Sequence, residues 1–192
     1  MISDDLATEK QRLREKLRFR RKHFAANLDS IAELTAFRAL PAPLAGLVAE
    51  HAPIAAYMSW GDEPDILPML ADCAPLLLPH HAARDETMGF RRWRPGDRLV
   101  KGPWSTPQPA DTAEEATPGL IFCPLVGFDR SGSRLGQGGG HYDRYFARHP
   151  DIPRIGVAWS VQEVDAVPSE TTDVALDAIL TEQEFILTGD RL

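Results

Sequence analysis

Residues 124–144 read PLVGFDRSGSRLGQGGGHYDR, and this stretch decides which fold the chain is expected to adopt. Five of the nine residues 132–140, at positions 132, 136, 138, 139 and 140, are glycines, which accept positive φ angles and let a ligand approach the main chain. An apolar run precedes the stretch and a run with helical spacing follows it. A strand, a glycine-rich loop and a helix N-terminus in this order present free N–H groups to phosphate. The stretch therefore predicts a phosphate-binding loop at 132–143, with Arg134 as a fixed cation.

Two widespread phosphate loops do not match this stretch. The P-loop requires a Gly-Lys-Ser/Thr tripeptide, which the chain lacks. The dinucleotide pattern Gly-x-Gly-x-x-Gly, begun at Gly136, requires glycine where His141 stands. Glycines alone are also typical of a flexible loop, so the longer pattern around them has to support the interpretation.

Outward from the loop, short apolar runs alternate with segments of helical spacing. The runs are bounded by Pro, Gly or polar residues, and apolar side chains at consecutive positions indicate strands that are buried on both faces. Strands that alternate with helices predict an α/β fold with a largely parallel central sheet. The expected strands are 54–59, 75–78, 120–125, 155–159 and 185–187, and the expected helices between them are about 64–72 and 140–149.

An apolar stripe predicts a helix over about residues 4–27. The stripe consists of Leu6, Leu13, Leu17, Phe24 and Leu28. Lys10 and Arg14 are four residues apart and flank the stripe, so both can reach a cleft where the helix packs. A solvated basic helix is the alternative. Three further cations of this helix are expected to point elsewhere: Arg12, Arg18 and Lys22.

Two later segments have a different texture. Residues 30–51 look like a second helix that breaks near Pro41 and Pro43. Residues 84–111 are rich in Arg, Gly, Pro and Trp and are expected to begin as a strand and to end as a proline-rich loop. The polar piece 107–118 is expected to be a solvated connector.

Composition limits the classes of protein that remain. The 192 residues suit a single domain, and the formal net charge of −7 is unlike that of a nucleic-acid binder. Residues 1–22 nevertheless carry eight basic and four acidic side chains. No apolar run reaches the roughly 18 residues of a membrane span, and two isolated cysteines suit a reducing cytoplasm. The pair His80-His81 lacks any zinc motif and is expected to be an ordinary loop.

The segment 134–144, RLGQGGGHYDR, resembles the signature of the 5-formyltetrahydrofolate cyclo-ligase family. Segments at 10–14, 57–63, 88–109 and 167–177 resemble other parts of that family in the same order. The resemblance implies a three-layer α/β/α sandwich. It also implies the ATP- and Mg²⁺-dependent closure of 5-formyltetrahydrofolate to 5,10-methenyltetrahydrofolate, in which the formyl oxygen is phosphorylated and N10 then attacks. A monomer is expected.

The same resemblance implies roles for individual residues. Arg134 is expected to be catalytic. The positions that would bind ATP are Lys10, Arg14, Arg134, Gly136, Gln137, Gly138, Gly139, Gly140, His141 and Tyr142. The positions that would bind the folate are Met58, Glu63, Trp104, Gly138, Gly139, Gly140 and His141, and those that would bind Mg²⁺ are Asp143 and Asp177. The chain departs from the family pattern at three places, His141 for tyrosine, Gln108 for glutamate and Thr172 for histidine.

Several alternatives stay open. Asp143 could be a helix cap, Asp177 a surface charge, Glu63 an acid at a helix N-terminus and Trp104 a buried loop anchor. The chain could be a paralogue that uses the same ATP loop on another small carboxylate. It could also be a regulator that binds a folate or nucleotide without catalysis.

Overall fold

The computed structural model describes residues 2–73, 75–84, 86–189 and 191–192 and is built on one seven-stranded sheet. The strand order is β11-β10-β9-β6-β1-β2-β3. The five central strands run parallel, and both edge strands, β11 and β3, are antiparallel to their neighbours. The strands are β1 Ile54–Ala55, β2 Leu76–His80, β3 Gly89–Trp93, β6 Leu120–Pro124, β9 Arg154–Val157, β10 Ala178–Leu180 and β11 Phe185–Leu187. The prediction of a largely parallel sheet is therefore confirmed.

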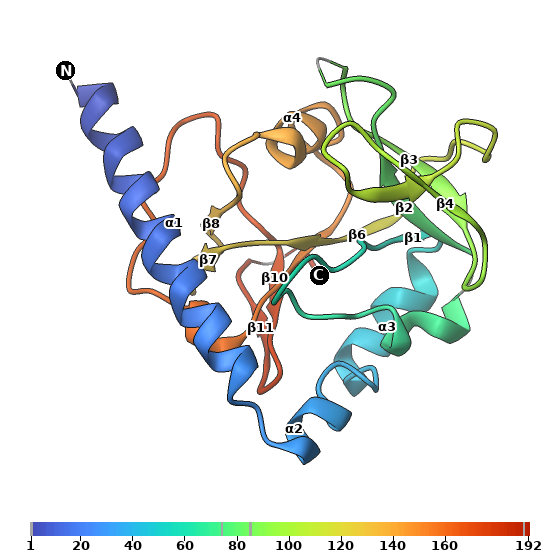
Figure 1. Ribbon diagram of the computed structural model, residues 1–192, viewed down its shortest axis with the longest axis horizontal. Coiled ribbons are helices and arrows are strands. Elements are labelled where there is room, and N and C mark those ends of the chain that lie inside the picture. The colour runs from blue at the N-terminus through green and yellow to red at the C-terminus, as the bar shows by residue number, and fades with distance from the viewer. Residues whose placement is uncertain (1, 74, 85, 190) are drawn as a thin grey trace.

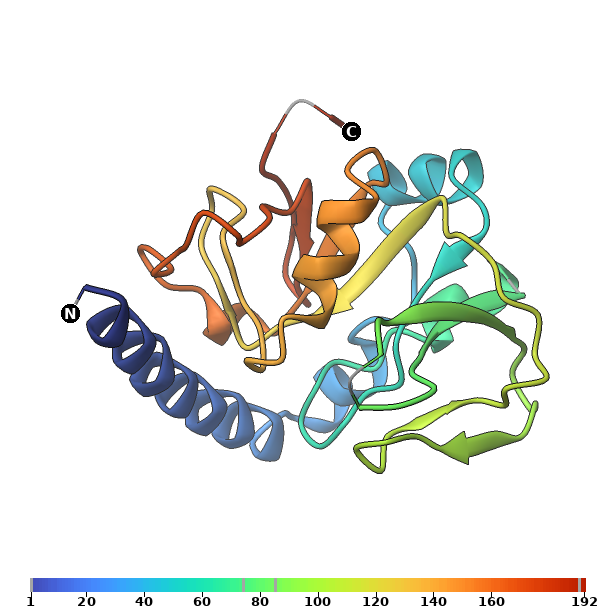
Figure 2. The same ribbon diagram turned by 90° about the horizontal axis from the view of Figure 1, so that it is seen from above.

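Helices cover both faces of this sheet (Figures 1 and 2). On one face Leu44 and Val48 of α3 pack against alternate strand residues such as Phe122. On the other face Tyr145 and Phe146 of α4 pack against the residues that point the opposite way. The helices are α1 Ile2–Ala26, α2 Ser30–Thr35, α3 Ala42–Glu50 and α4 His141–Arg148, with 3-10 turns η1 Pro68–Cys73 and η2 Ser160–Gln162. The three-layer α/β/α sandwich is thus present.

The predicted helix boundaries are close to the observed ones where local signals are strong. The break expected in 30–51 lies between α2 and α3, where Pro41 stands at the N-cap of α3 and lacks the N–H that a continuous helix would use. The helix expected at 64–72 is wrong: only a 3-10 turn forms at Pro68–Cys73. Bonds from Met69 and Leu70 to carbonyls three residues earlier replace α-helical ones there.

Residues 107–118 are not a free connector, contrary to the prediction. They begin with β5 Pro107–Pro109, which pairs with β4 Leu99–Lys101 in a ribbon beside β2 and β3. Beyond β5, the carboxylate of Glu114 lies 3.0 Å from Arg92 and that of Glu115 lies 3.8 Å from Arg91. The polar residues of this segment therefore neutralise the arginines of β3.

Helix α1 lies across the segments that follow the carboxyl ends of the parallel strands (Figures 1 and 2). It contacts η2 after β9. Gly127, after β6, packs so closely that a Cβ there would lie 2.3 Å from Leu17. The ribbon of β7 Gly127–Phe128 and β8 Arg134–Leu135 leads from this contact into the glycine loop. Among the described residues, no helix is long and apolar enough to cross a membrane.

Gly119→Ala is expected to lower the free energy of unfolding by about 3 kcal/mol. A Cβ at Gly119 would lie 2.2 Å from the carbonyl oxygen of His51, which is main chain and cannot move without disturbing the entry to β6. The matched control is Gly46→Ala, in the open part of α3, where a Cβ meets nothing within 4 Å and removal of glycine should stabilise the helix by up to about 1 kcal/mol. Urea unfolding measures both, and equal midpoints for the two variants would contradict the expectation.

Candidate functional site

The glycine loop has the backbone that the sequence predicts for a phosphate site. Gly138 and Gly140 have φ angles of 107° and 61°, where side chains other than glycine are strained. Gly140 is also the N-cap of α4, and no side chain caps that helix. The first N–H groups of α4 therefore lack a side-chain partner, as a helix terminus that receives an anion requires.

Arginines of α1 hold the loop from one side. Arg14 Nε donates a hydrogen bond to the carbonyl of Gly136 at 2.9 Å. Arg18 Nη2 donates to the side-chain oxygen of Gln137 at 2.7 Å. The prediction that Arg18 points elsewhere is wrong, because an arginine side chain is long enough to reach sideways from its position on the helix.

Lys10 lies about one turn nearer the N-terminus of the same helix, beside two carboxylates. It is 7% exposed, and its Nζ lies 2.6 Å from Asp173 and 3.5 Å from Glu170. These carboxylates come from the C-terminal acidic segment, so this segment and the glycine loop both contact α1. The structure thus brings Lys10 and Arg14 onto one side of α1, with Lys10 already paired.

Glu63 connects the glycine loop to the segment after β1. Gln137 Nε2 donates to its Oε1 at 3.2 Å, and the main-chain N–H of Trp60 donates to its Oε2 at 3.1 Å. Arg21 Nη1 lies 3.5 Å from Oε1. Burial raises the pKa of the Glu63 carboxyl above its usual range, and Arg21 works against that rise. Met58, at the start of this segment, packs against the core.

Three rings meet at the other side of the loop. His81, Trp104 and His141 lie edge to face, with centroids 4.6 to 4.7 Å apart. Burial and the neighbouring His141 lower the pKa of His81 to about 4, and burial together with Arg144 lowers that of His141. Both imidazoles are therefore neutral at neutral pH. His81 stands in the loop after β2, as expected. Its packing against Trp104 and His141 arises from tertiary folding, which no local pattern shows.

Gln108 fixes the main chain that carries His81. Its amide oxygen accepts from the N–H of His81 at 3.2 Å, and its amide nitrogen donates to the carbonyl of His81 at 3.0 Å. A glutamate accepts but cannot donate when ionised. The departure at Gln108 therefore has a structural function in this chain.

Arg134 lies beneath the loop. Its side chain is 4% exposed and pairs with Asp143 of α4. Its guanidinium carbon lies 5.5 Å from the ring centroid of Phe146 and 5.9 Å from that of Tyr142. A Cβ at Gly136 would lie 3.1 Å from Arg134 Nη1, so a glycine at this position lets the charge come close under the loop.

Comparison with known proteins shows the family to which this sequence is similar. A model of the 5-formyltetrahydrofolate cyclo-ligase family matches residues 7–182. The chain belongs to this family. The 5-formyltetrahydrofolate cyclo-ligase of Mycolicibacterium smegmatis is 32% identical over 163 residues, which are 75% of this chain and 80% of that protein. The Escherichia coli K12 protein of the same name is 29% identical over 142 residues, 67% of this chain and 76% of that one.

A solved structure of the family supports the same fold. The NMR structure of 5,10-methenyltetrahydrofolate synthetase from Aquifex aeolicus superposes with a TM-score of 0.73 at 25% sequence identity, and the match covers 94% of this chain and 93% of that one. The second solved structure, the synthetase from Mycoplasma pneumoniae, has a TM-score of 0.58 at 23% identity and covers 90% of this chain and 98% of that one, which shows the fold.

The two carboxylates that the cyclo-ligase resemblance assigns to Mg²⁺ lie in different settings. Asp177 stands just before β10, and its carboxylate accepts from the N–H of Arg154 at 2.9 Å and lies 3.3 Å from Arg191. Asp143 pairs with Arg134 in the first turn of α4. Within the described part of the chain, no three His, Cys, Asp or Glu residues are placed to hold a metal ion. Among the described residues, no hydrogen bond or ion pair joins the Asp177 side chain to Asp143 or to residues 136–142, although the N–H of the preceding Leu176 donates to the carbonyl of Gly132 at 2.9 Å.

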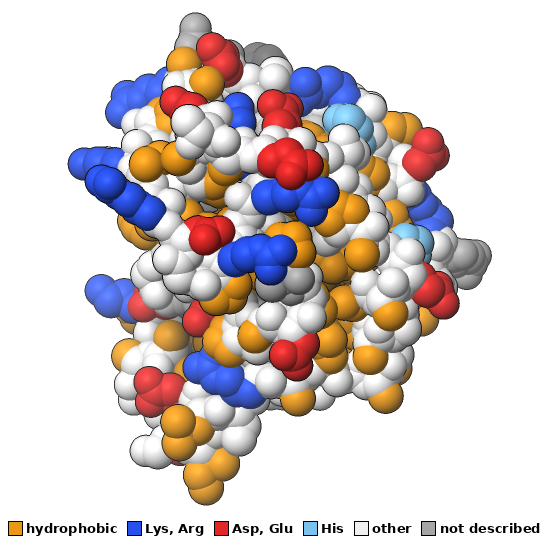
Figure 3. Space-filling view, turned by 90° about the vertical axis from the view of Figure 1, so that its right-hand side faces the viewer, with side chains coloured by type: hydrophobic (Ala, Val, Ile, Leu, Met, Phe, Trp, Pro, Cys, Tyr) orange, Lys and Arg blue, Asp and Glu red, His pale blue; other side chains and the backbone are white. Residues whose placement is uncertain are grey.

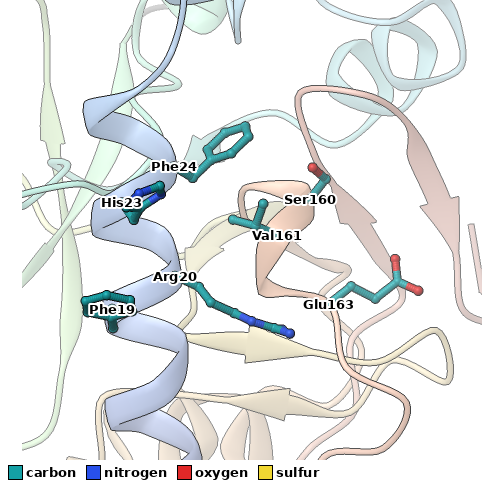
Figure 4. A pocket seen from close by; sticks show the side chains of 7 residues that line it. All are labelled: Phe19, Arg20, His23, Phe24, Ser160, Val161 and Glu163. Atoms are coloured by element: carbon teal, nitrogen blue, oxygen red, sulfur yellow. The ribbon is translucent and has the colours of Figure 1, made fainter.

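Another surface of this cyclo-ligase family member has a lining that includes none of the predicted site residues. A groove of about 440 Å³ lies on the opposite flank of α1 and faces η2 (Figure 4). Its lining is Phe19, Arg20, His23, Phe24, Ser160, Val161 and Glu163. The face toward β3 and β4 carries basic and acidic side chains interspersed among apolar ones (Figure 3). In the Arg-rich stretch on that side, Arg91 and Arg92 lie beside Glu115 and Glu114, so the stretch is no unbroken basic surface.

Proposed function

We propose that this protein closes 5-formyltetrahydrofolate to 5,10-methenyltetrahydrofolate at the expense of ATP, with release of ADP and phosphate. The contact between Gln137 of the glycine loop and Glu63 supports this most directly. A loop suited to phosphates and a carboxylate suited to the donor edge of a pterin are thereby neighbours. Phosphoryl transfer from a nucleotide to a folate requires such an adjacent placement of the two substrates.

In the proposed reaction the formyl oxygen attacks the γ-phosphorus of ATP, the bond to the β,γ-bridging oxygen breaks, and ADP leaves. The N10 amine then attacks the activated formyl carbon and loses its proton. The former formyl oxygen leaves as part of phosphate, which completes the methenyl bridge. In such transfers the protein positions the substrates and stabilises the developing charge, and it supplies little covalent chemistry.

The nucleotide side of the site consists of the glycine loop and α1. The main-chain N–H groups of residues 136–142 are proposed to bind the phosphates together with Arg14, which already contacts the loop. Lys10 would exchange its bond to Asp173 for a phosphate oxygen. Arg134 would supply positive charge from beneath the loop toward the transferred group.

The folate side lies between Glu63 and the three-ring cluster. The Glu63 carboxylate is proposed to accept hydrogen bonds from the N–H groups of the pterin. Trp104, which is 40% exposed, and His141 offer flat faces to the rings of the folate. Met58 would contribute apolar contact on the side of the core.

Mg²⁺ is proposed to enter with ATP, since this ion is usually held by one or two carboxylates and the phosphates themselves. It would neutralise phosphate charge when bound. Asp143, at the N-terminus of α4 beside the loop, fits as a carboxylate ligand through Oδ2, because its pairing with Arg134 uses Oδ1. Asp177 does not fit, because Arg154 and Arg191 already occupy its oxygens.

The reaction is tested by mixing purified protein with 5-formyltetrahydrofolate, Mg²⁺ and ATP and following the absorbance of 5,10-methenyltetrahydrofolate. Product should form only when all three are present, with one ADP released for each turnover. A paralogue would hydrolyse ATP faster with another carboxylate than with this folate. A regulator would bind the folate in calorimetry and release no ADP, and either result would overturn the proposal.

The proposed setting is a monomeric, single-domain enzyme of the cytoplasm whose partners are small anions and not nucleic acid. Both cysteines, Cys73 and Cys123, are free, which suits a reducing compartment. Sedimentation analysis measures the oligomeric state. A stable dimer would contradict that part of the proposal without touching the reaction.

A further inference from the structure

Arg21 is a buried cation to which the resemblance to the family assigns no role. The residue is 4% exposed and extends from α1 toward the segment after β1. Among the residues that the structure describes, its Nε and Nη1 atoms have no hydrogen-bond partner. The nearest opposite charge is Glu63 Oε1, 3.5 Å from Nη1. Burying a guanidinium with so few bonds is unfavourable, so its charge is expected to act on a neighbour.

The neighbour that gains from this charge is Glu63. The Glu63 side chain is 7% exposed, and a buried carboxyl tends to remain protonated and neutral. A protonated carboxyl loses acceptor capacity toward the N–H groups of a pterin. Glu63 therefore needs a compensating cation on its inner side if it is to receive a ligand as a carboxylate.

We infer that Arg21 is a positioning residue for folate recognition: it keeps Glu63 ionised and aims its carboxylate into the folate side of the site. This inference rests on the proposed function, in which the Glu63 carboxylate binds the pterin. Arg21 itself need not touch the folate. Glu63 is then held on three sides, by Arg21, by the amide of Gln137 and by the N–H of Trp60.

The other titratable groups near Glu63 do not replace this cation. Tyr57 after β1 is buried and Tyr142 of α4 is half-buried, and loss of solvent raises the pKa of each hydroxyl well above its usual value, so both stay neutral. Asp62 and Asp65 flank Glu63 in its own segment and carry the same sign of charge. Arg18 reaches Glu63 only through Gln137. Without Arg21, only the hydrogen bonds from Trp60 and Gln137 oppose the effect of burial, so the pKa of Glu63 rises further.

The test compares Arg21→Met, Arg21→Lys and wild type in the binding of 5-formyltetrahydrofolate by calorimetry and in kcat/KM, from about pH 5.5 to about pH 8.5. In Arg21→Met we expect the loss of binding on acidification to begin at a higher pH. This lowers affinity roughly tenfold at the acid end of the range, and the curves converge at the alkaline end. Arg21→Lys should keep most of the wild-type profile, and KM for ATP should stay within about twofold in both variants.

Two further variants separate positioning from a loss of structure. Arg20→Gln removes the same charge from the adjacent residue, whose side chain lines the groove on the other flank of α1 (Figure 4), and should leave the profile unchanged. Glu63→Gln removes the titrating group, so adding Arg21→Met to it should not alter the pH dependence of binding. A wild-type pH profile in Arg21→Met, or equal losses for ATP and folate, would overturn the inference. A wild type that binds with the expected pH dependence but forms no product would overturn the proposed function alone.

Discussion

Arg134→Ala is expected to lower kcat about a thousandfold while KM for both substrates changes only a few-fold. The guanidinium lies beneath the glycine loop, close under Gly136, and pairs with Asp143 at the start of α4. Its charge is held in place by buried rings, so it requires little rearrangement when negative charge moves onto the transferred group. An alanine removes this charge and leaves Asp143 repelling the phosphates.

Single-turnover formation of methenyltetrahydrofolate measures this effect directly. Arg134→Lys restores charge but not the forked geometry and should recover only part of the rate. Arg130→Ala is the matched control, because Arg130 belongs to the same β7–β8 hairpin but pairs with Glu163 and Glu184 on the surface. A normal kcat in Arg134→Ala with an unchanged thermal midpoint would remove Arg134 from the reaction.

Glu63→Gln is expected to lower kcat/KM for 5-formyltetrahydrofolate about a hundredfold and to leave KM for ATP nearly unchanged. The amide keeps the size of the side chain but loses the charge and one acceptor toward the pterin. Hydrogen bonds to charged groups contribute about 1.5–3 kcal/mol, which sets this magnitude. The amide also faces Arg21 with no charge to balance it.

Steady-state kinetics with each substrate varied in turn separates the two KM values. Asp62→Asn is the matched control, since the main-chain carbonyl of Asp62 accepts from Trp159 and, among the described residues, its side chain makes no hydrogen bond or ion pair with the glycine loop. It should lower kcat/KM for the folate less than threefold. If Glu63→Gln raised KM for ATP as much as KM for the folate, Glu63 would position the glycine loop and would not bind the pterin.

The fold was predictable where neighbouring residues decide it. The apolar stripe of α1, the prolines between α2 and α3 and the apolar run of β6 are local signals. Strand β10 has only three residues and lies between polar segments. Its apolar run is too short to be recognised as a strand from the sequence. Strand β5 forms because β4 lies opposite it, and its two prolines favour no strand on their own.

The candidate site likewise contains residues that the sequence predicts and residues that it does not. The glycine positions follow from the sequence because positive φ angles require that residue type. Arg18 and Arg21 were missed because a helical projection gives directions but not the reach of a long side chain. His81 was missed because it meets Trp104 and His141 only through tertiary folding. The pairing of Asp177 with Arg154 and Arg191 likewise depends on tertiary folding, which no spacing in the sequence reveals.

The placement of α1 has a consequence for how the chain is made. This helix is synthesised before its partners, which are Glu63, Gln137, the η2 turn and Asp173, all much later in the chain. At 5–20 residues per second a ribosome needs on the order of 10 s to add the roughly 150 residues between α1 and Asp173. During that time the helix carries its apolar stripe and its row of cations without their final contacts. Helix α1 can therefore make its final contacts only after the segments around Glu63, Gln137, η2 and Asp173 have been synthesised.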